Sequence, residues 1–264
     1  MNNYINNYNF FTKKLVFQFE YGMGGIGDYL KFFTYIYNYC IKNNIKLFLS
    51  IDHPLNKYIR LKYDIMYVNI NDIKNYKYIN SREELENLDD NIYYIIKPFV
   101  LYNIDNIVKD ICNKWILNDI FFFTNDILYE CNNINDYKQY ISIHLRLGDK
   151  FLETDNNFII CKEDIRFYNQ NDLENFIEKN IERKIYFFCD NNNFKQMLKN
   201  KYPYINITNF KIGHTSLLNT TEEETKNSII EFCLLSQSSE IYGASYSGFS
   251  FMASRFNNIK YTQI

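Results

Sequence analysis

The sequence predicts an α/β protein built from two Rossmann-like domains whose parallel sheets face a central cleft. Two observations lead to this prediction. Short apolar segments typical of strands alternate with segments of helical length along the whole chain, an order that favours parallel sheets covered by helices. The two blocks meet near the polar stretch Asn132–Asp136, and 264 residues suffice for two small domains. We therefore expect one domain at residues 1–130 and a second at residues 131–264.

The first half holds three strand candidates and three helix candidates. The strands are short apolar runs, the last of them ended by Pro98, and Ser81 is suited to cap the shortest, charged helix. The Asn-rich segment 69–80 is expected as a surface excursion. The expected elements are a strand at 15–19, a helix at 29–43, a strand at 45–51, a helix beginning after Ser81, a strand at 92–96 and a helix at 106–117.

The second half opens with the most informative strand, at residues 140–147. Aliphatic residues alternate there with Ser142, His144 and Arg146, which predicts a half-buried strand that presents an imidazole beside a guanidinium. This pair suits a ligand with planar oxygen groups, above all phosphate, although a strand with solvated polar residues is the alternative. A turn at Gly148-Asp149 follows. The later expected elements are helices at 172–180, 193–201, 222–237 and 248–256, and strands at 184–189, 205–207 and 240–242.

Composition excludes several classes of function. The formal net charge of -2 gives no basic field for nucleic acid, so any anion site must be local. The six cysteines form no Cys-x-x-Cys pair, which disfavours a zinc site or a disulfide scaffold and fits a reducing compartment. The N-terminus lacks an apolar signal core, and no run of about 18 apolar residues occurs. We expect a soluble, cytoplasmic protein without a transmembrane segment.

A glycine-rich loop follows the first strand. Gly22, Gly24 and Gly27 match G-x-G-x-x-G, and glycines at such a turn let the backbone approach a ligand at the start of a helix. Asp52 ends the next strand, where a dinucleotide-binding fold places a ribose-binding acid. One hypothesis is therefore an NAD(P)-dependent oxidoreductase, and another is a purely structural turn packed on a helix.

Two further segments connect strands to helices and carry candidate ligand-binding residues. In the stretch 243–250, Ser245 or Ser247 can cap the helix and bind an anion, although a simple N-cap is equally consistent. Together with His144 and Arg146 in the same half, this stretch suggests a diphosphate site. Asp190 ends the strand at 184–189, where it either contacts a base or ribose hydroxyl or caps the helix that starts near Asn193.

Three segments resemble motifs of the fucosyltransferase superfamily, which includes α1,2-, α1,6- and protein O-fucosyltransferases. Its H-x-R-x-x-D motif is similar to residues 144–150, its N-terminal G-G-x-G-N loop to residues 24–28, and its third motif to residues 229–237 followed by 244–250. The three segments occur in the family's order. The resemblance implies a GT-B fold, an N-terminal acceptor-side domain, a C-terminal GDP-sugar domain, inversion at the anomeric carbon and no required metal or other cofactor.

The resemblance also implies roles for individual residues. Arg146 is expected to grip the β-phosphate, and His144 to support the diphosphate or its sugar. Glu231 falls where α1,6-type members place an acidic nucleotide contact. The remaining expected donor-binding residues are Asp149, Lys150, Asp190, Ser245 and Ser247, and the acceptor-side loop contains Gly24, Gly25 and Gly27.

Two departures from the motifs bear on mechanism. Leu147 stands where many members have a second Arg, and Asp28 stands where Asn is usual. The loop also resembles the start of heptosyltransferases, another GT-B group, in which that Asp is a candidate base. We therefore expect Arg146 and Asp28 to be catalytic, the latter as the base for the acceptor hydroxyl, with a helix N-cap as its alternative role.

The leading functional hypothesis is an inverting glycosyltransferase that moves a sugar, with fucose as the favoured one, from a GDP-sugar to a hydroxyl of a glycan or other acceptor. Its expected partners are thus a nucleotide sugar and a glycan-type acceptor. Without a metal, cations and helix-start N–H groups must stabilise the departing diphosphate. The alternatives are the NAD(P)-dependent oxidoreductase and a non-catalytic nucleotide-sugar-binding protein.

Overall fold

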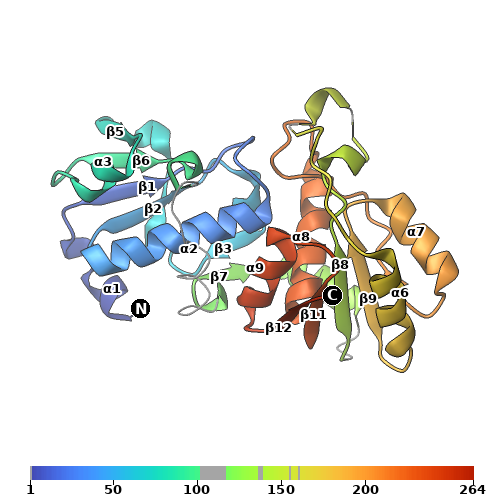
Figure 1. The fold of residues 1–264 in the computed structure, drawn as a ribbon. Helices are drawn as coiled ribbons and strands as arrows, with labels where there is room; N and C mark the ends of the chain where they lie inside the picture. The colour runs from blue at the N-terminus through green and yellow to red at the C-terminus, as the bar shows by residue number, and fades with distance from the viewer. Residues whose placement is uncertain (1, 102–116, 136–138, 155, 160) are drawn as a thin grey trace.

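Two five-stranded parallel sheets, one in each half of the chain, organise the molecule (Figure 1). The computed structural model describes residues 2–101, 117–135, 139–154, 156–159 and 161–264. The first sheet has the order β4-β2-β1-β6-β5, with strands Tyr67–Val68, Lys46–Ser50, Lys14–Phe17, Tyr93–Ile96 and Tyr76–Ile79. The second has the order β10-β9-β8-β11-β12, with strands Asn206–Ile207, Ile185–Cys189, Ile141–Leu145, Glu240–Gly243 and Lys260–Gln263.

This architecture confirms the predicted α/β class with two Rossmann-like parallel sheets. A small antiparallel pair, β3 (Ile59–Leu61) and β7 (Phe121–Phe123), lies outside the two sheets. The division of the chain at residue 130 stays a prediction; that residue lies within α5 (Asn125–Ile134).

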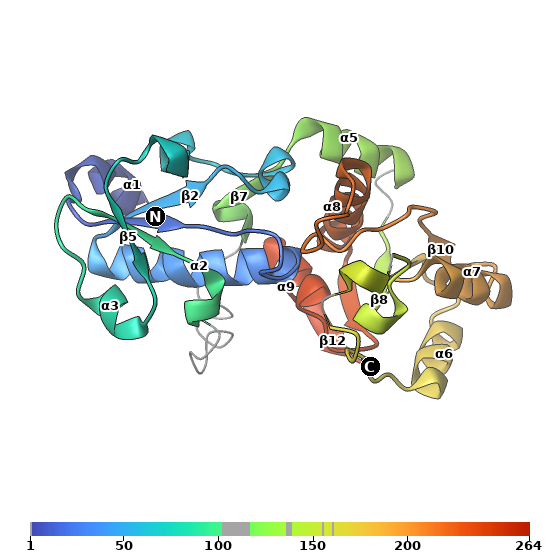
Figure 2. The same cartoon turned by 90° about the horizontal axis from the view of Figure 1, so that it is seen from above.

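Helices cover the sheets in layers, as the view from above shows (Figure 2). The long helix α2 (Ile26–Asn43) packs along β1 and β2, while α1 (Asn2–Asn7) and α3 (Arg82–Glu86) are short. In the second half, α8 (Glu222–Gln237) and α9 (Gly248–Phe256) lie on the face of the sheet toward the first half, and α6 (Gln170–Lys179) and α7 (Asn192–Lys201) lie on the opposite face.

The hydrophobic core follows these layers. One cluster of buried side chains runs from the first sheet through α2 to α8 and α9, and includes Phe17, Phe33, Phe232 and Met252. A second cluster lies between the second sheet and the pair α6 and α7. The two halves are therefore joined by apolar packing as well as by the chain connection.

The strand that carries His144 is buried on both faces, so the prediction of a half-buried strand is wrong. Every residue of β8 is buried, including Ser142 and His144, because α8 and α9 cover the face that the alternation assigned to solvent. Ser142 and His144 are therefore buried rather than exposed to open water.

The other predicted elements of the described residues are present, most with ends shifted by one to three residues, and α8 and α9 have the predicted bounds. Ser81 caps α3 as expected, accepting a hydrogen bond from the Glu84 amide at 3.2 Å. The segment expected as a surface excursion contains the edge strand β5, whose side chains are mostly exposed. The helix expected at 106–117 lies outside the described residues, except for Leu117 in a 3₁₀ turn. The elements α1, β3, β4, β5, β7, α5 and β12 were not predicted.

Within the described residues, no helix combines the length and the apolar character needed to cross a lipid bilayer.

Candidate functional site

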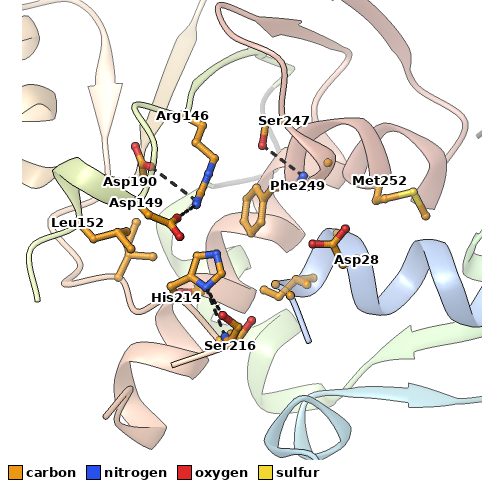
Figure 3. A pocket seen from close by; sticks show the side chains of 18 of the residues that line it. Asp28, Arg146, Asp149, Leu152, Asp190, His214, Ser216, Ser247, Phe249 and Met252 are labelled. Atoms are coloured by element: carbon orange, nitrogen blue, oxygen red, sulfur yellow. Dashed lines mark hydrogen bonds and ion pairs between the residues drawn. The ribbon is translucent and has the colours of Figure 1, made fainter. Parts of the chain in front are cut away.

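A cavity of about 440 Å³ lies between the two halves, where α2 and α9 begin. Figure 3 shows Arg146, Asp149 and Asp190 on one side and Asp28 of α2 on the other. The glycine-rich loop supplies the wall from the first half, with Gly22, Gly24, Gly25 and Gly27. The other predicted site residues that line the cavity are Asp28, His144, Arg146, Asp149, Asp190, Glu231 and Ser247. The structure thus brings together residues from both halves, as the sequence predicts for a cleft.

Arg146 follows the end of β8 and is surrounded by carboxylates. Its guanidinium donates a hydrogen bond to Asp149 and forms ion pairs with Asp190 at 3.6 Å and Asp164 at 3.9 Å. Burial raises the pKa of Asp149 and the two neighbouring carboxylates add to this effect, whereas Arg146 opposes it. The positive charge of Arg146 is therefore balanced within the protein, and an anionic ligand must compete with Asp149 for it.

Asp190 fixes the turn after β8. Its carboxylate accepts hydrogen bonds from the amides of Leu147 at 2.8 Å and Gly148 at 3.2 Å. The helix that follows is capped by Asn191, which accepts from the Phe194 amide, so the alternative of Asp190 as an N-cap is wrong. Asp190 still borders the cavity, and its predicted contact with a base or ribose stays a prediction.

The segment 164–166 lies against this same turn. The Arg166 amide donates to the Leu147 carbonyl at 2.8 Å, and the Asp149 amide donates to the Asp164 carboxylate at 3.2 Å. Gly148 has φ of +106°, and a Cβ there would lie 2.3 Å from the Asp164 carbonyl oxygen, so only glycine permits this approach. Asp164 and Arg166 both line the cavity, and neither was predicted.

His144 is a neutral imidazole on the cavity wall. It is only 5% exposed, and its ring stacks on that of Phe249 with centroids 5.3 Å apart. Burial, helped by the neighbouring Arg146, lowers its pKa to about 3. Within the described part of the chain, its Nδ1 has no hydrogen-bond partner. Buried polar groups are nearly always paired, so this nitrogen is an exception among the described residues.

The two serines of the last loop have different roles. Ser247 caps α9 by accepting from the Phe249 amide at 3.3 Å, and it borders the cavity at the positive end of the helix dipole. Ser245 accepts from the Arg146 amide at 2.9 Å and donates to the Arg146 carbonyl at 2.8 Å. It therefore ties the end of β8 to the loop after β11, and its side chain is not among those that line the cavity. Lys150 does not line the cavity either.

Glu231 forms an ion pair with a buried lysine. The side chain of Lys195 is 1% exposed and lies 3.0 Å from the Glu231 carboxylate, which also accepts a hydrogen bond from Thr208. Burial raises the pKa of Glu231, while Lys195 and the Thr208 hydroxyl act against this shift. The carboxylate thus reaches the cavity already oriented by two partners.

Asp28 lies in the first turn of α2 but does not cap it. Gly25 occupies the N-cap position, so the alternative of Asp28 as an N-cap is wrong. The Asp28 carboxylate forms an ion pair with Lys31 at 2.7 Å. It also folds back toward the glycine loop, because a Cβ at Gly24 would lie 2.6 Å from Asp28 Oδ2. With φ of +121°, Gly24 is required by backbone conformation as well as by space.

The loop 212–216 supplies a part of the site that sequence reasoning missed. His214 Nδ1 lies 2.9 Å from the Ser216 hydroxyl, and burial, helped by Arg146, lowers the His214 pKa to about 3. The Ser216 carbonyl accepts from the Gly22 amide at 2.7 Å, which links the two halves at the cavity. The buried hydroxyl of Thr215 has no hydrogen-bond partner in the described residues. No periodic pattern marks this loop, so only its polar His-Thr-Ser sequence signals it.

Two further observations concern groups that a metal or a dinucleotide would contact. Within the described ranges, no group of three or more His, Cys, Asp or Glu side chains is arranged to hold a metal ion. Asp52, the acid of the dinucleotide hypothesis, accepts a hydrogen bond from Ser50 at 2.8 Å and is not among the residues that line the cavity.

Comparison with solved structures shows which proteins share this fold. The chain matches a mutant of Arabidopsis thaliana FUT1 in complex with GDP (11% identity, 100% of this chain and 74% of that chain, TM-score 0.56). It also matches the α-1,6-fucosyltransferase NodZ of Bradyrhizobium soaked with GDP-fucose (10%, 93% and 92%, TM-score 0.57) and POFUT1 in complex with GDP (10%, 96% and 99%, TM-score 0.51).

No protein-family profile matches the sequence, and neither does any curated protein. At these identities the structural matches establish the fold, which confirms the predicted resemblance at that level. The chain has the GT-B fold of fucosyltransferases.

Proposed function

We propose that this protein is an inverting glycosyltransferase that moves a sugar, with fucose as the favoured one, from a GDP-sugar to a hydroxyl of a glycan or other acceptor. One observation carries the proposal: a single cavity joins His144, Arg146 and the capped start of α9 to the glycine loop of the other half. The fold supports it, because solved proteins of this fold bind GDP or GDP-fucose. In this proposal residues 131–264 hold the donor, and residues 1–130 face the acceptor.

The departing nucleoside diphosphate is the main electrostatic problem of the reaction. Arg146 and the amides at the start of α9 oppose its growing charge, and His144 on the cavity wall offers a neutral contact. Asp149 orients Arg146, and Ser245 fixes its backbone. These groups act without a metal in our proposal. Transfer should therefore persist in EDTA, and loss of transfer restored by Mg²⁺ or Mn²⁺ would refute this part.

In our proposal, the nucleobase and the ribose lie deeper in the C-terminal half than the two phosphates. We propose that Glu231 and Asp190 contact the base or the ribose, because both carboxylates reach the cavity and are held by partners of their own. Lys150 follows Asp149 on the motif turn, and its amide bonds to the Asp164 carbonyl at 3.3 Å. We assign it to holding this turn, since its side chain does not line the cavity.

In the transfer step, the acceptor oxygen forms a bond to the anomeric carbon while the bond from that carbon to the β-phosphate oxygen breaks. The electron pair leaves with GDP, and the acceptor proton passes to a base. Asp28 is the proposed base, since it borders the cavity from the acceptor-side loop that contains Gly24, Gly25 and Gly27. Asp28→Asn should leave GDP affinity unchanged and lower transfer about a hundredfold or more. Equal transfer by this variant would remove Asp28 from the mechanism.

A nucleotide panel tests the donor. Titration of the protein with GDP, UDP, ADP and NAD, followed by thermal unfolding and calorimetry, should show stabilisation by GDP above the others. Stabilisation by NAD alone would favour the oxidoreductase hypothesis, in which the glycine loop binds a dinucleotide. The position of Asp52 outside the cavity lining argues against that outcome.

A second measurement separates an enzyme from a binding protein. Incubation of the purified protein with GDP-fucose should release GDP slowly even without acceptor, because water can replace the acceptor hydroxyl. The matched control is Arg183→Ala, because Arg183 pairs with Glu240 and is not among the residues that line the cavity. GDP binding with no release of GDP from GDP-fucose, with and without a panel of glycan acceptors, would support the non-catalytic alternative.

A further inference from the structure

The charges around the cavity are poorly matched to a diphosphate if Arg146 acts alone. Three cationic side chains line the cavity within the described residues: Lys31, Arg146 and Arg166. Lys31 is paired with Asp28 at 2.7 Å. Arg146 is shared among three carboxylates, all of them at most 16% exposed. A diphosphate brings two or more negative charges, so a further cation is needed beside Arg146.

Arg166 is the remaining cation, and its backbone position is fixed. Its amide donates to the Leu147 carbonyl at 2.8 Å, directly after Arg146 in the chain. The close approach of Gly148 to Asp164 and Ile165 holds the segment on this turn, because a Cβ at Gly148 would lie 2.3 Å from the Asp164 carbonyl oxygen. Backbone contacts therefore hold Arg166 beside Arg146, although 20 residues separate the two in the sequence.

The carboxylate of Asp164 connects the two guanidinium groups. Its Oδ1 lies 2.8 Å from Arg166 Nε, and its Oδ2 lies 3.9 Å from a terminal nitrogen of Arg146. This contact is an ion pair without hydrogen-bond geometry, because Arg166 Nε has no hydrogen-bond partner among the described residues. The Arg166 side chain is 41% exposed, which leaves it accessible to a ligand in the cavity.

We infer that Arg166 is a second phosphate-binding residue of this site, which acts with Arg146 on the two phosphates of a nucleoside diphosphate. This inference deepens the proposed function and rests on it. A planar guanidinium offers two parallel donors to a phosphate, which an ammonium group cannot do. Asp164 keeps the two like charges close together before the ligand arrives.

Calorimetry with a ligand series tests the inference. Guanosine, GMP, GDP and inorganic pyrophosphate are titrated into the wild-type protein, Arg166→Ala, Arg166→Lys and the control Arg183→Ala. Arg183 is a suitable match because its side chain is 39% exposed and paired with Glu240, close to the values for Arg166. If Arg166 only formed a structural ion pair, Arg166→Ala would change the free energy of unfolding, as Arg183→Ala would. It would not change the affinity for the ligands according to how many phosphates each ligand carries.

We expect Arg166→Ala to bind GDP and pyrophosphate about tenfold more weakly and guanosine unchanged, which is the loss of one charge-assisted contact. Arg166→Lys should recover part of this loss, because it keeps the charge without the planar geometry. The dependence of GDP affinity on ionic strength should also flatten in Arg166→Ala. Arg183→Ala should behave as the wild type.

Two outcomes would overturn the inference, and they differ from failure of the proposed function. If Arg166→Ala binds GDP and pyrophosphate as tightly as the wild type, Arg166 has no phosphate role although the protein binds GDP. If guanosine affinity falls as much as GDP affinity, the residue acts on structure instead. If the wild type binds pyrophosphate but no guanine nucleotide, the proposed donor is wrong, and the pyrophosphate arm still decides the role of Arg166.

Discussion

Gly27 of α2 lies against Gly248 of α9, backbone to backbone: a Cβ at Gly27 would lie 2.5 Å from the carbonyl carbon of Gly248 and 2.8 Å from the Phe249 amide nitrogen. The starts of two helices from opposite halves therefore meet at one edge of the cavity. Because each helix start carries partial positive charge, this contact gathers amide dipoles where an anion would bind.

This contact predicts opposite effects for two glycine-to-alanine variants. Gly27→Ala should lower the free energy of unfolding by about 1–3 kcal/mol, because the new methyl group overlaps backbone atoms that cannot rotate away. In Gly248→Ala the methyl group has no neighbour within 4 Å, so stability should stay equal or rise by up to about 1 kcal/mol. Urea unfolding of both variants is the measurement, and equal destabilisation of the two would contradict the proposed contact.

Arg146 is expected to affect stability as well as ligand binding. Arg146→Ala leaves Asp149, Asp164 and Asp190 without their common cation, which should cost about 2–4 kcal/mol of unfolding free energy, at or below the range for buried pairs. Adding Asp149→Asn should restore part of that stability but none of the affinity for GDP. Chemical unfolding and calorimetry on both variants check this. Recovery of GDP affinity in the double variant would show that Arg146 serves structure alone.

The buried pair of Lys195 and Glu231 should show non-additive energetics. Lys195→Met leaves a buried carboxylate without its cation, and we expect a loss of about 3–5 kcal/mol. The double variant Lys195→Met with Glu231→Met removes both charges and should be more stable than the single variant. Urea unfolding measures the difference. A double variant as unstable as the sum of both single variants would mean that the two charges do not interact.

All three histidines should make the fold sensitive to acid. Burial lowers the pKa of His53 to about 4 and those of His144 and His214 to about 3. The unfolded chain therefore takes up protons below about pH 6.5 while the folded chain does not, so the free energy of unfolding should fall as the pH drops from about 6.5 toward 3. The raised carboxyl pKa values of Asp149 and Glu231 act in the opposite direction, so a matched variant is needed.

His53→Asn provides that variant. His53 Nδ1 accepts from the Leu55 amide at 3.2 Å as an N-cap, and an Asn side chain can make the same contact without titrating. We expect this variant to lose about 1–3 kcal/mol less stability than the wild type between about pH 7 and about pH 4. Urea unfolding at several pH values measures the slope. Identical slopes for the two proteins would show that His53 does not titrate on unfolding.

Local patterns in the sequence were enough for most of the fold. Alternating apolar residues, helical spacing and caps such as Ser81 and Ser247 act over a few residues, so the strands and helices around them were predicted close to their observed bounds. The same local signals placed the glycine loop, His144 and Arg146 at the ends of strands. Parallel strands direct those ends to one edge of each sheet, which is why these residues meet at the cavity.

Burial of β8 and the roles of its neighbours required the tertiary structure. The alternation along 141–146 is the same whether the polar face meets water or the helices α8 and α9, and only the packing of α9 decides between them. Asp190 and Asp28 were each suited to cap a helix by their position, but Asn191 and Gly25 take those places. At α7 the Asn191 side chain reaches the free Phe194 amide, whereas Gly25 begins α2 without a side-chain hydrogen bond. The caps lie one residue after Asp190 and three residues before Asp28.

The sequence by itself determined the α/β class, the alternation of elements and the motifs that border the cavity, because those depend on contacts between residues close together in the chain. Only the tertiary structure decided that Asp164 and Arg166 lie on the turn after β8, and that Gly22 bonds to Ser216 across the two halves. These contacts join segments separated by tens to hundreds of residues, and no local period or cap encodes them. The physical reason is that the compact packing of two sheets, rather than any short-range preference, brings these segments together.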